Sequence, residues 1–303
     1  MLTFKIKSTT LEGLNANAIE IKIEMFNLIL NVIDINGGKY TSGAYSGMFY
    51  IEMGEAPQSF AGTTSTINAT ETVPNKTWID GGNYYTDTNN PNIQYVKNGD
   101  NYYLVEPIRW IIIADENYTG TGGTLGVDYF SNTTIASQDR TKLTAVASRQ
   151  IVIVSEKLIA NYLFGPYYDN YSTYMTDLRA KIFTASEIAL LKTISYSTYI
   201  TNTYTPYNET FSLFRGRQVG ENFYASTYLT APALMKASET SYLSEETSNP
   251  TDLSAYWSRS YYYGTSTSYH AGYITTDGTI SNMYNPYSSI GIRPIFAIDF
   301  LFS

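Results

Sequence analysis

Alternation of apolar and polar residues is the strongest pattern in the chain. Near the start, "TFKIKS" and "AIEIKIEMF" alternate, and "NLILNVIDI" continues the pattern up to Gly37-Gly38. A period of two residues is typical of β-strands with one buried face, and paired glycines favour a break between elements. We therefore predict a small N-terminal β unit over residues 1–40 and, after a glycine-containing connection, a main domain over residues 47–303.

In the main domain, two dipeptides predict β-hairpins. Asn98-Gly99 follows "IQYVK" and precedes "DNYYLVEPIRWIIIA", and Asp277-Gly278 lies within "HAGYITTDGTISN". Both dipeptides are favoured in tight turns that need positive φ angles. The stretch 61–92 has few aliphatic residues and is predicted as a polar loop. Further strands are predicted at 48–60, 149–156 and 290–300.

Helices are predicted mainly in the middle of the chain. "TYMTDLRAKIF" places Met175, Leu178 and Ile182 at spacings of three and four residues. "TASEIALLKTI" opens with Thr184 and Glu187 at the spacing of a capping box. A shorter helix is predicted at "APALMKAS", residues 231–238. The order of elements predicts an α+β fold with few helices, many short strands and long loops.

Composition narrows the possible functions. The 303 residues contain no cysteine, one histidine and a net charge of −8, without a cluster of Lys or Arg. Nucleic-acid binding by phosphate neutralisation needs the opposite charge, so that class is disfavoured. The longest apolar run is too short to span a bilayer, and no signal peptide is recognisable. We expect no metal, because a zinc site needs several His, Cys or carboxylate ligands, and no cofactor.

The stretch from Tyr256 to Ser289 consists mostly of Tyr, Ser, Thr, Gly and Asn. This is the composition of antibody loops, in which Tyr supplies large amphipathic contact area and the small polar residues supply adaptable hydrogen bonds. We interpret the stretch as a binding surface, with tyrosines packed along their own strands as the open alternative. The predicted ligand-binding residues are Tyr261, Tyr262, Tyr263, Tyr269, His270, Tyr273, Tyr284 and Tyr287.

Two arginines lie among apolar residues, Arg109 in "PIRW" and Arg293 in "GIRPI". They are predicted to be structural, with a packed stem and a hydrogen-bonded guanidinium, and Trp110 and Trp257 are predicted to lie in the core. An anion-binding pair of arginines is the alternative.

Five segments in order resemble a large uncharacterised family of bacterial and phage domains: "FYIEMGEAPQSF", "YYLVEPIRWIII", "FTASEIALLK", "YWSRS" and "GIRPIFAIDF". That family looks like a variant of the C-type-lectin-like fold, as found in formylglycine-generating enzymes and in the variable proteins of diversity-generating retroelements. The resemblance covers residues 47–303. It implies a C-type-lectin-like domain whose binding face lies just before the closing strand.

The same resemblance limits the chemistry. Formylglycine-generating enzymes depend on cysteine, which this chain lacks. Lectins of the fold often hold sugar through calcium at Glu-Pro-Asn, whereas here Glu106-Pro107 continues to Ile108. A calcium site in the oxygen-rich stretch Asp80–Asn92 stays open as an alternative to a simple turn region.

We therefore expect a non-enzymatic recognition or display protein. The favoured role is a phage virion accessory, such as a head or tail fibre or a capsid decoration protein, that binds a host-surface glycan or protein. Residues 1–40 would anchor it to other virion proteins, and a homo-oligomer is expected. The alternatives are a bacterial surface or intracellular binding module, and a carbohydrate-active enzyme that uses carboxylates such as Glu52/Glu55 or Glu245/Glu246.

Overall fold

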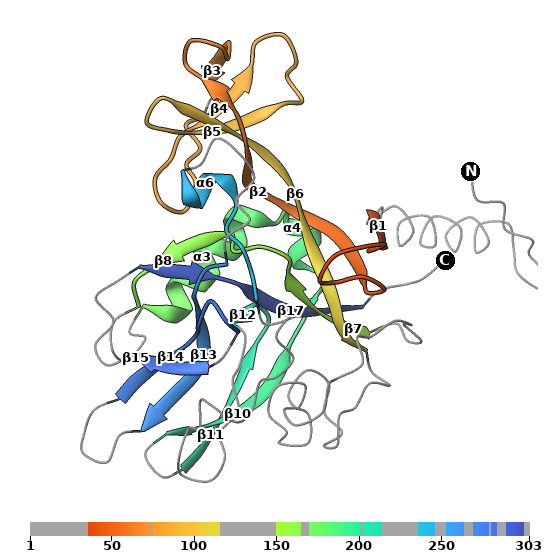
Figure 1. The fold of residues 1–303 in the computed structure, drawn as a ribbon, viewed down its shortest axis with the longest axis vertical. Helices are drawn as coiled ribbons and strands as arrows, with labels where there is room; N and C mark the ends of the chain where they lie inside the picture. The colour runs from red at the N-terminus through yellow and green to blue at the C-terminus, as the bar shows by residue number, and fades with distance from the viewer. Residues whose placement is uncertain are drawn as a thin grey trace, which may run out of the picture. The chain divides into compact units, whose positions relative to one another are not determined.

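The computed structural model describes residues 36–72, 74–115, 150–164, 170–200, 203–213, 236–245, 253–263, 269–278, 280–283 and 289–299 (Figure 1). The chain divides into two units, Met1–Asn36 and Gly37–Ser303. The strands predicted before Asn36 lie outside the described residues.

Most of the described strands belong to one sheet of ten strands, called the large sheet. Its strands are β1 (Asn36–Lys39), β2 (Phe49–Thr63), β3 (Ala69–Glu71), β4 (Tyr84–Asp87), β5 (Gln94–Asn98), β6 (Asn101–Asp115), β7 (Gln150–Ser155), β9 (Leu191–Lys192), β12 (Ser212–Leu213) and β17 (Pro294–Asp299). The main order is β12-β17-β7-β6-β5-β4-β3, and β2 pairs with both β1 and β6. The predicted hairpin at Asn98-Gly99 is confirmed, because β5 and β6 pair up to Asn98 and Asn101.

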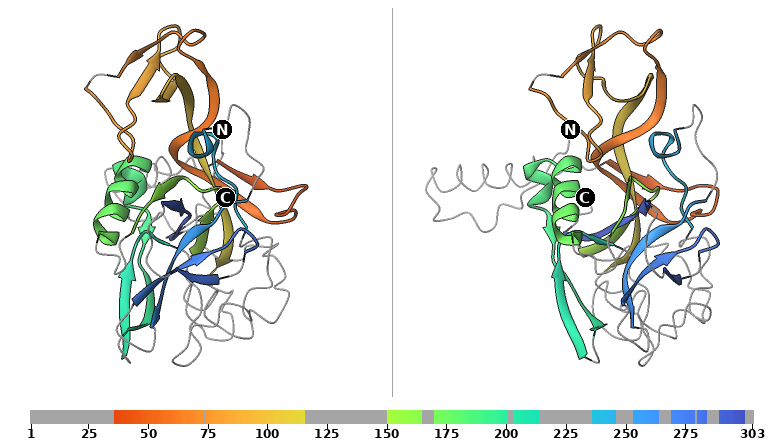
Figure 2. Two further views of the ribbon diagram at one scale, coloured as in Figure 1. Left: turned by 60° about the vertical axis from the view of Figure 1, so that its left-hand side comes forward. Right: turned by 90° about the vertical axis from the view of Figure 1, so that its left-hand side faces the viewer.

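A second sheet of five described strands is called the small sheet. Its strands are β8 (Ala160–Tyr162), β13 (Tyr256–Tyr263), β14 (Tyr269–Ile274), β15 (Ile280–Met283) and β16 (Ile290–Ile292), and its order is β15-β14-β13-β16-β8. The predicted hairpin at Asp277-Gly278 joins β14 to β15. Separately, β10 (Ile194–Ile200) pairs with β11 (Thr203–Glu209). Figure 2 shows this pair at the opposite end of the unit from β3, β4 and β5.

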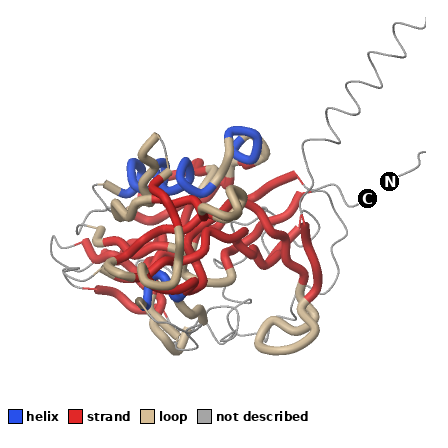
Figure 3. The backbone as a smooth tube through the Cα atoms, turned by 90° about the horizontal axis from the view of Figure 1, so that it is seen from above, coloured by secondary structure: helices blue, strands red, loops and turns tan. Residues whose placement is uncertain are grey.

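Three helices are described, and they lie at the margins of the strands (Figure 3). They are α3 (Tyr171–Ile182), α4 (Ala185–Ile188) and α6 (Ser241–Ser244). Met175, Leu178 and Ile182 are buried on α3, as their spacing predicted. The predicted capping box is present on α4: Thr184 Oγ1 accepts from the Glu187 amide at 3.3 Å, and Glu187 Oε2 accepts from the Thr184 amide at 2.7 Å. The fold is therefore a mainly-sheet α+β fold.

Two local predictions are wrong. The stretch 61–92 is not simply a polar loop, because it contains β3 and β4. Its apolar surface comes from aromatic rather than aliphatic residues: Trp78 and Tyr84 are both buried. The helix predicted over residues 231–238 is not formed at its C-terminal end, because Ser238 instead forms an isolated β-bridge with Leu253. The rest of that segment, residues 231–235, lies outside the described residues.

The predicted closing strand is two strands that belong to different sheets. Residues 290–292 form β16 of the small sheet, and residues 294–299 form β17 of the large sheet. Arg293 lies at the crossing and is fully buried. Its Nε donates to the Ser155 carbonyl at 2.9 Å, and its terminal nitrogens lie 3.3 Å from the Tyr256 hydroxyl and 3.4 Å from the Tyr45 hydroxyl. Arg293 therefore links the two sheets through hydrogen bonds.

Aromatic residues make up much of the described core. The Trp110 ring lies 4.6 Å from the Phe296 ring and 5.7 Å from the Phe183 ring, measured between centroids. Its indole N–H donates to the Met53 carbonyl at 2.7 Å. Trp257 is buried under the small sheet, where its indole N–H donates to the Tyr162 carbonyl at 2.7 Å. Burial of two large rings with their N–H groups paired is a strong source of stability.

Gly54 allows β2 to bulge against α3 and α4. Its φ is +63°, and a Cβ at this position would lie 2.6 Å from side-chain atoms of Ile182 and Phe183. Its amide donates to Glu187 Oε1 at 2.8 Å, so the capping residue of α4 also holds the bulge. Only glycine adopts this φ readily and leaves room for the two side chains.

We expect Gly54→Ala to lower the free energy of unfolding by about 2 kcal/mol, from backbone strain and overpacking together. Gly43→Ala is the matched control, because Gly43 also has a positive φ of +77°, whereas a Cβ added there would meet no atom within 4 Å. It should lose only about 1 kcal/mol. Urea denaturation of both variants measures the difference, and equal losses would refute the packing argument.

Candidate functional site

The tyrosine-rich residues predicted to bind a ligand come together on two neighbouring strands. Tyr261, Tyr262 and Tyr263 of β13 pair in register with Ala271, His270 and Tyr269 of β14. The register shifts between Trp257 and Tyr261, so a bulge separates this tyrosine-rich end from the buried start of β13. β-Bulges are common where a strand carries a functional surface. We call the backbone of residues 261–263 and 269–271 the tyrosine-rich strand pair.

Burial changes along the same strands. Tyr256 and Trp257, before the bulge, are fully buried, and Tyr273 is half-buried opposite Trp257. The side chains of residues 259–271 lie outside the described part of the structure, as do Tyr284 and Tyr287 entirely. The structure therefore places the backbones of five of the predicted binding residues in one strand pair, and it places Tyr273 nearer the core.

Tyrosine also serves as a core residue in this protein. Eight tyrosines are buried among the residues with described side chains: Tyr84, Tyr95, Tyr102, Tyr103, Tyr171, Tyr174, Tyr242 and Tyr256. Several donate to carboxylates, as Tyr95 does to Asp87 at 2.9 Å and Tyr242 does to Asp80 at 2.7 Å. Burial raises the pKa of Tyr95 to about 12, and the Asp87 hydrogen bond adds to the effect. A tyrosine-rich composition alone does not define a binding surface.

The stretch considered for calcium is organised by its own chain. Asp80 accepts from the Gly82 amide at 2.9 Å, and Asp87 accepts from the amides of Asn89 and Asn90 at 2.8 and 3.0 Å. These amide bonds, that of Asn89 first, and the Tyr95 hydroxyl hold the pKa of Asp87 below its ordinary value. Over the residues that the structure describes, no three His, Asp or Glu side chains are grouped so that they could hold a metal ion.

Arg109 lies at the surface, unlike Arg293. Its side chain is 49% exposed, its Nε forms an ion pair with Glu52 Oε1 at 3.0 Å, and its guanidinium lies 4.9 Å from the centroid of the Tyr50 ring. The hydrogen bond to Glu52 is the main cause that raises the pKa of Arg109, and burial opposes it. The Arg109 side chain therefore lies at the surface next to Glu52, whereas the side chain of the next residue, Trp110, faces the core.

Pro107 lies where the pairing of β6 on one side is interrupted, and a charged pocket lies beside it. β6 pairs with β5 up to Leu104 and with β7 from Trp110 onward, while β2 runs along its other side. Pro107 lies between these two limits and has no N–H to offer a further strand. Gln58 of β2 reaches this part of β6, where its Nε2 donates to the carbonyls of Glu106 at 3.0 Å and Pro107 at 2.8 Å.

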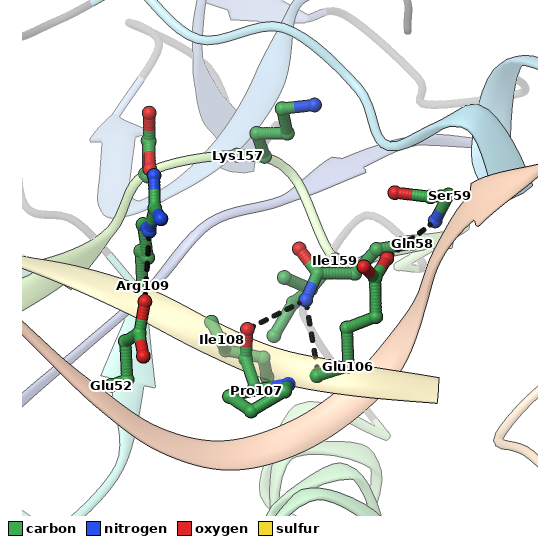
Figure 4. Close-up of a pocket in the computed structure, with 10 residues that line it drawn as sticks. Glu52, Gln58, Ser59, Glu106, Pro107, Ile108, Arg109, Lys157 and Ile159 are labelled. Atoms are coloured by element: carbon green, nitrogen blue, oxygen red, sulfur yellow. Dashed lines mark hydrogen bonds and ion pairs between the residues drawn. The ribbon is translucent and has the colours of Figure 1, made fainter. Parts of the chain in front are cut away.

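The pocket has a volume of about 300 Å³ (Figure 4). Its lining residues come from β2, from β6 and from the turn after β7: Glu52, Gln58, Ser59, Glu106, Pro107, Ile108, Arg109, Glu156, Lys157 and Ile159. Figure 4 shows Arg109 and Glu52 at one end of it, and Ser59 and Glu106 at the other. Glu106 Oε2 accepts from the Ser59 amide at 3.0 Å, which fixes that end. We call it the Pro107 pocket.

The half-buried Tyr40 lies near Glu156, one of the residues that line the Pro107 pocket. Burial and the neighbouring Glu156 carboxylate raise the pKa of Tyr40 well above its ordinary range. The Glu156 amide donates to the Arg109 carbonyl at 2.9 Å, which extends the β6–β7 pairing by one residue. Glu52, Arg109 and Glu156 thus form a row of alternating charges across three adjacent strands, the arrangement that favours attraction between cross-strand neighbours.

Glu52, Glu106 and Arg109 were named from the sequence, but the pocket that they border was not predicted. Gln58, Glu156 and Lys157 carry no motif. The signal that was available is the proline inside the apolar strand "YYLVEPIRWIII", because proline in a strand marks a position that is unpaired on one side.

These features define a mainly-sheet α+β protein with a tyrosine-rich strand pair on one sheet and a charged pocket on the other. The family model of a domain of unknown function, DUF6273, matches residues 128–300, more than half of the chain, so the protein belongs to that family. No curated protein and no solved structure matches the chain significantly. None of the helices described is both long enough and apolar enough to span a membrane.

Proposed function

We propose that this is a non-enzymatic recognition protein that binds a glycan or protein surface through the tyrosine-rich strand pair. The observation that supports it most is the register that aligns Tyr261–Tyr263 with Tyr269 and His270 beyond the bulge in β13. Tyrosines gathered in this way offer contact area at a low cost in side-chain entropy. The apolar residues that precede them, Tyr256 and Trp257, are buried and supply a fixed base.

The fold assignment is part of the proposal. A variant of the C-type-lectin-like fold is supported by the closing strands, which cross from the small to the large sheet, and by the hairpin β14–β15 that precedes them. The proposed setting is a phage head or tail accessory, for which the low charge and the richness in Tyr, Ser and Thr are the support.

Carboxylate-based hydrolysis is the weaker function. In the Pro107 pocket, Glu52 is paired with Arg109, and Glu106 accepts a backbone amide. Both carboxylates are engaged in contacts within the protein, whereas a glycoside hydrolase needs two carboxyl groups that face the scissile bond.

The test compares variants of the strand pair with a variant of its base. Tyr262→Ala and Tyr269→Ala should melt near wild type but lose binding on a printed glycan array, since interface tyrosines often contribute 2 kcal/mol or more, roughly a thirtyfold change in affinity. Trp257→Ala should instead lower the melting temperature sharply. If both tyrosine variants unfold as readily as Trp257→Ala, the strand pair is core and the proposal fails.

A further inference from the structure

The Pro107 pocket has a polar side chain, Gln58, that is held in place by hydrogen bonds but can still accept a further one. Both N–H groups of the Gln58 carboxamide are occupied by the carbonyls of Glu106 and Pro107, so the side chain is fixed. Its oxygen accepts no hydrogen bond from any residue within the described ranges, and Figure 4 shows Gln58 next to Ile159, below Lys157. A side chain fixed through one end presents the other end without a further loss of entropy.

The charges of the pocket are nearly balanced within it. Arg109 is paired with Glu52 and is also under the influence of the Glu156 charge. Two charged side chains can still form further hydrogen bonds or ion pairs. Among the described residues, one carboxylate oxygen of Glu106 has no donor and Lys157 has no ion-pair partner. A ligand with a single charge would pair with only one of these two groups, whereas hydroxyl groups can hydrogen-bond to both.

Acceptors and donors therefore surround the same space. The acceptors are the oxygens of Gln58 and Glu106, and the donor with three free N–H groups is Lys157. Hydroxyl groups satisfy such a mixture best, because each one both donates and accepts. The exposed Pro107 ring gives the pocket one apolar edge, and the side chains of Ile108 and Ile159 are buried. A cyclic polyol has both the hydroxyls and a C–H face for such an edge.

We propose that the Pro107 pocket binds a neutral sugar unit and is a second binding site, separate from the tyrosine-rich strand pair. Glu106 and Gln58 accept hydrogen bonds from sugar hydroxyls, and Lys157 donates to others. The exposed Pro107 ring contacts the ring carbons. The volume of about 300 Å³ is at the lower end of the range for small-ligand pockets, which fits a single ring with its substituents.

The experiment titrates the whole protein with the methyl glycosides of glucose, galactose, mannose and N-acetylglucosamine. Binding is monitored through the NMR chemical shifts of the backbone amides. One or more of them should shift the amides of Gln58, Ser59 and Lys157 in a saturable way. Glu106→Gln and Lys157→Met should each weaken binding roughly tenfold or more, because a charge-assisted hydrogen bond is lost. Glu55→Gln is the control, since Glu55 is exposed on the same strand as Gln58 but does not line the pocket.

Other outcomes overturn the proposal. No saturable shift with any sugar, or shifts with glycine and betaine in their place, would exclude a sugar site. Binding that is lost in Tyr262→Ala but kept in Lys157→Met would place the sugar on the tyrosine-rich strand pair, which leaves the proposed function intact and refutes the pocket. Release of methanol from the glycosides would show catalysis instead of binding.

Discussion

Arg293→Met is expected to lower the free energy of unfolding by about 3–5 kcal/mol, because it removes the donor from two or three buried acceptors. Arg293 is 0% exposed and donates to groups on both sheets: the Ser155 carbonyl at the end of β7 and the Tyr256 hydroxyl at the start of β13. Methionine fills a similar volume but donates nothing, so these acceptors are left buried without that donor. Each such group costs about 1–3 kcal/mol.

Two further variants make this test specific. Arg109→Met removes an exposed ion pair and should cost about 1 kcal/mol or less. Arg293→Lys keeps the charge, but an ammonium does not reproduce the planar fork that reaches Ser155, Tyr256 and Tyr45 together, so most of the loss should remain. Guanidinium denaturation measures all three. If Arg293→Met costs no more than Arg109→Met, Arg293 does not link the sheets.

These two arginines show how far the sequence alone could lead. Both occur between apolar residues, in "PIRW" and "GIRPI", and local composition does not distinguish them. The difference arises from sheet topology. Arg109 lies within one strand and points away from the face that Trp110 buries, whereas Arg293 lies where the chain changes sheets. A contact between residues that are far apart in sequence, such as Arg293 with Tyr45, leaves no local trace.

Local signals were reliable where the interaction itself is local. The capping box at Thr184 and Glu187 and the hairpins at Asn98-Gly99 and Asp277-Gly278 formed as predicted, because residues close in sequence decide them. The strands β3 and β4 were missed because aromatic side chains, not aliphatic ones, bury that region. The Pro107 pocket was missed because it needs three segments, around Gln58, Glu106 and Lys157, to come together.

Alkaline unfolding is the largest effect expected. Burial is the main cause that raises the pKa of seven tyrosines above the ordinary value of 10.0: Tyr40, Tyr84, Tyr95, Tyr103, Tyr174, Tyr242 and Tyr256. Such a tyrosine stays protonated in the folded protein while the unfolded chain ionises. Its contribution to stability is therefore complete below pH 10 and is lost as the pH rises further, by about 1.4 kcal/mol per pH unit for each residue.

Together these phenols should remove several kcal/mol of stability by about pH 11, a large part of the total for an ordinary domain. The protein should therefore unfold cooperatively above pH 10. Tyrosinate absorbance and circular dichroism should change at the same pH, because ionisation requires unfolding. Separate transitions, with tyrosinate formed while the strands persist, would show that these phenols ionise in the folded state and would contradict the prediction.

Tyr174→Phe and Tyr242→Phe separate ionisation from hydrogen bonding. The Tyr174 hydroxyl is buried without a hydrogen-bond partner in the described part of the chain, so its removal should leave stability at neutral pH unchanged or slightly higher. The Tyr242 hydroxyl donates to Asp80 at 2.7 Å, so Tyr242→Phe should lose about 1.5–3 kcal/mol at neutral pH. Both variants have one ionisable phenol fewer, and in both the loss of stability between neutral and alkaline pH should be smaller than in the wild type.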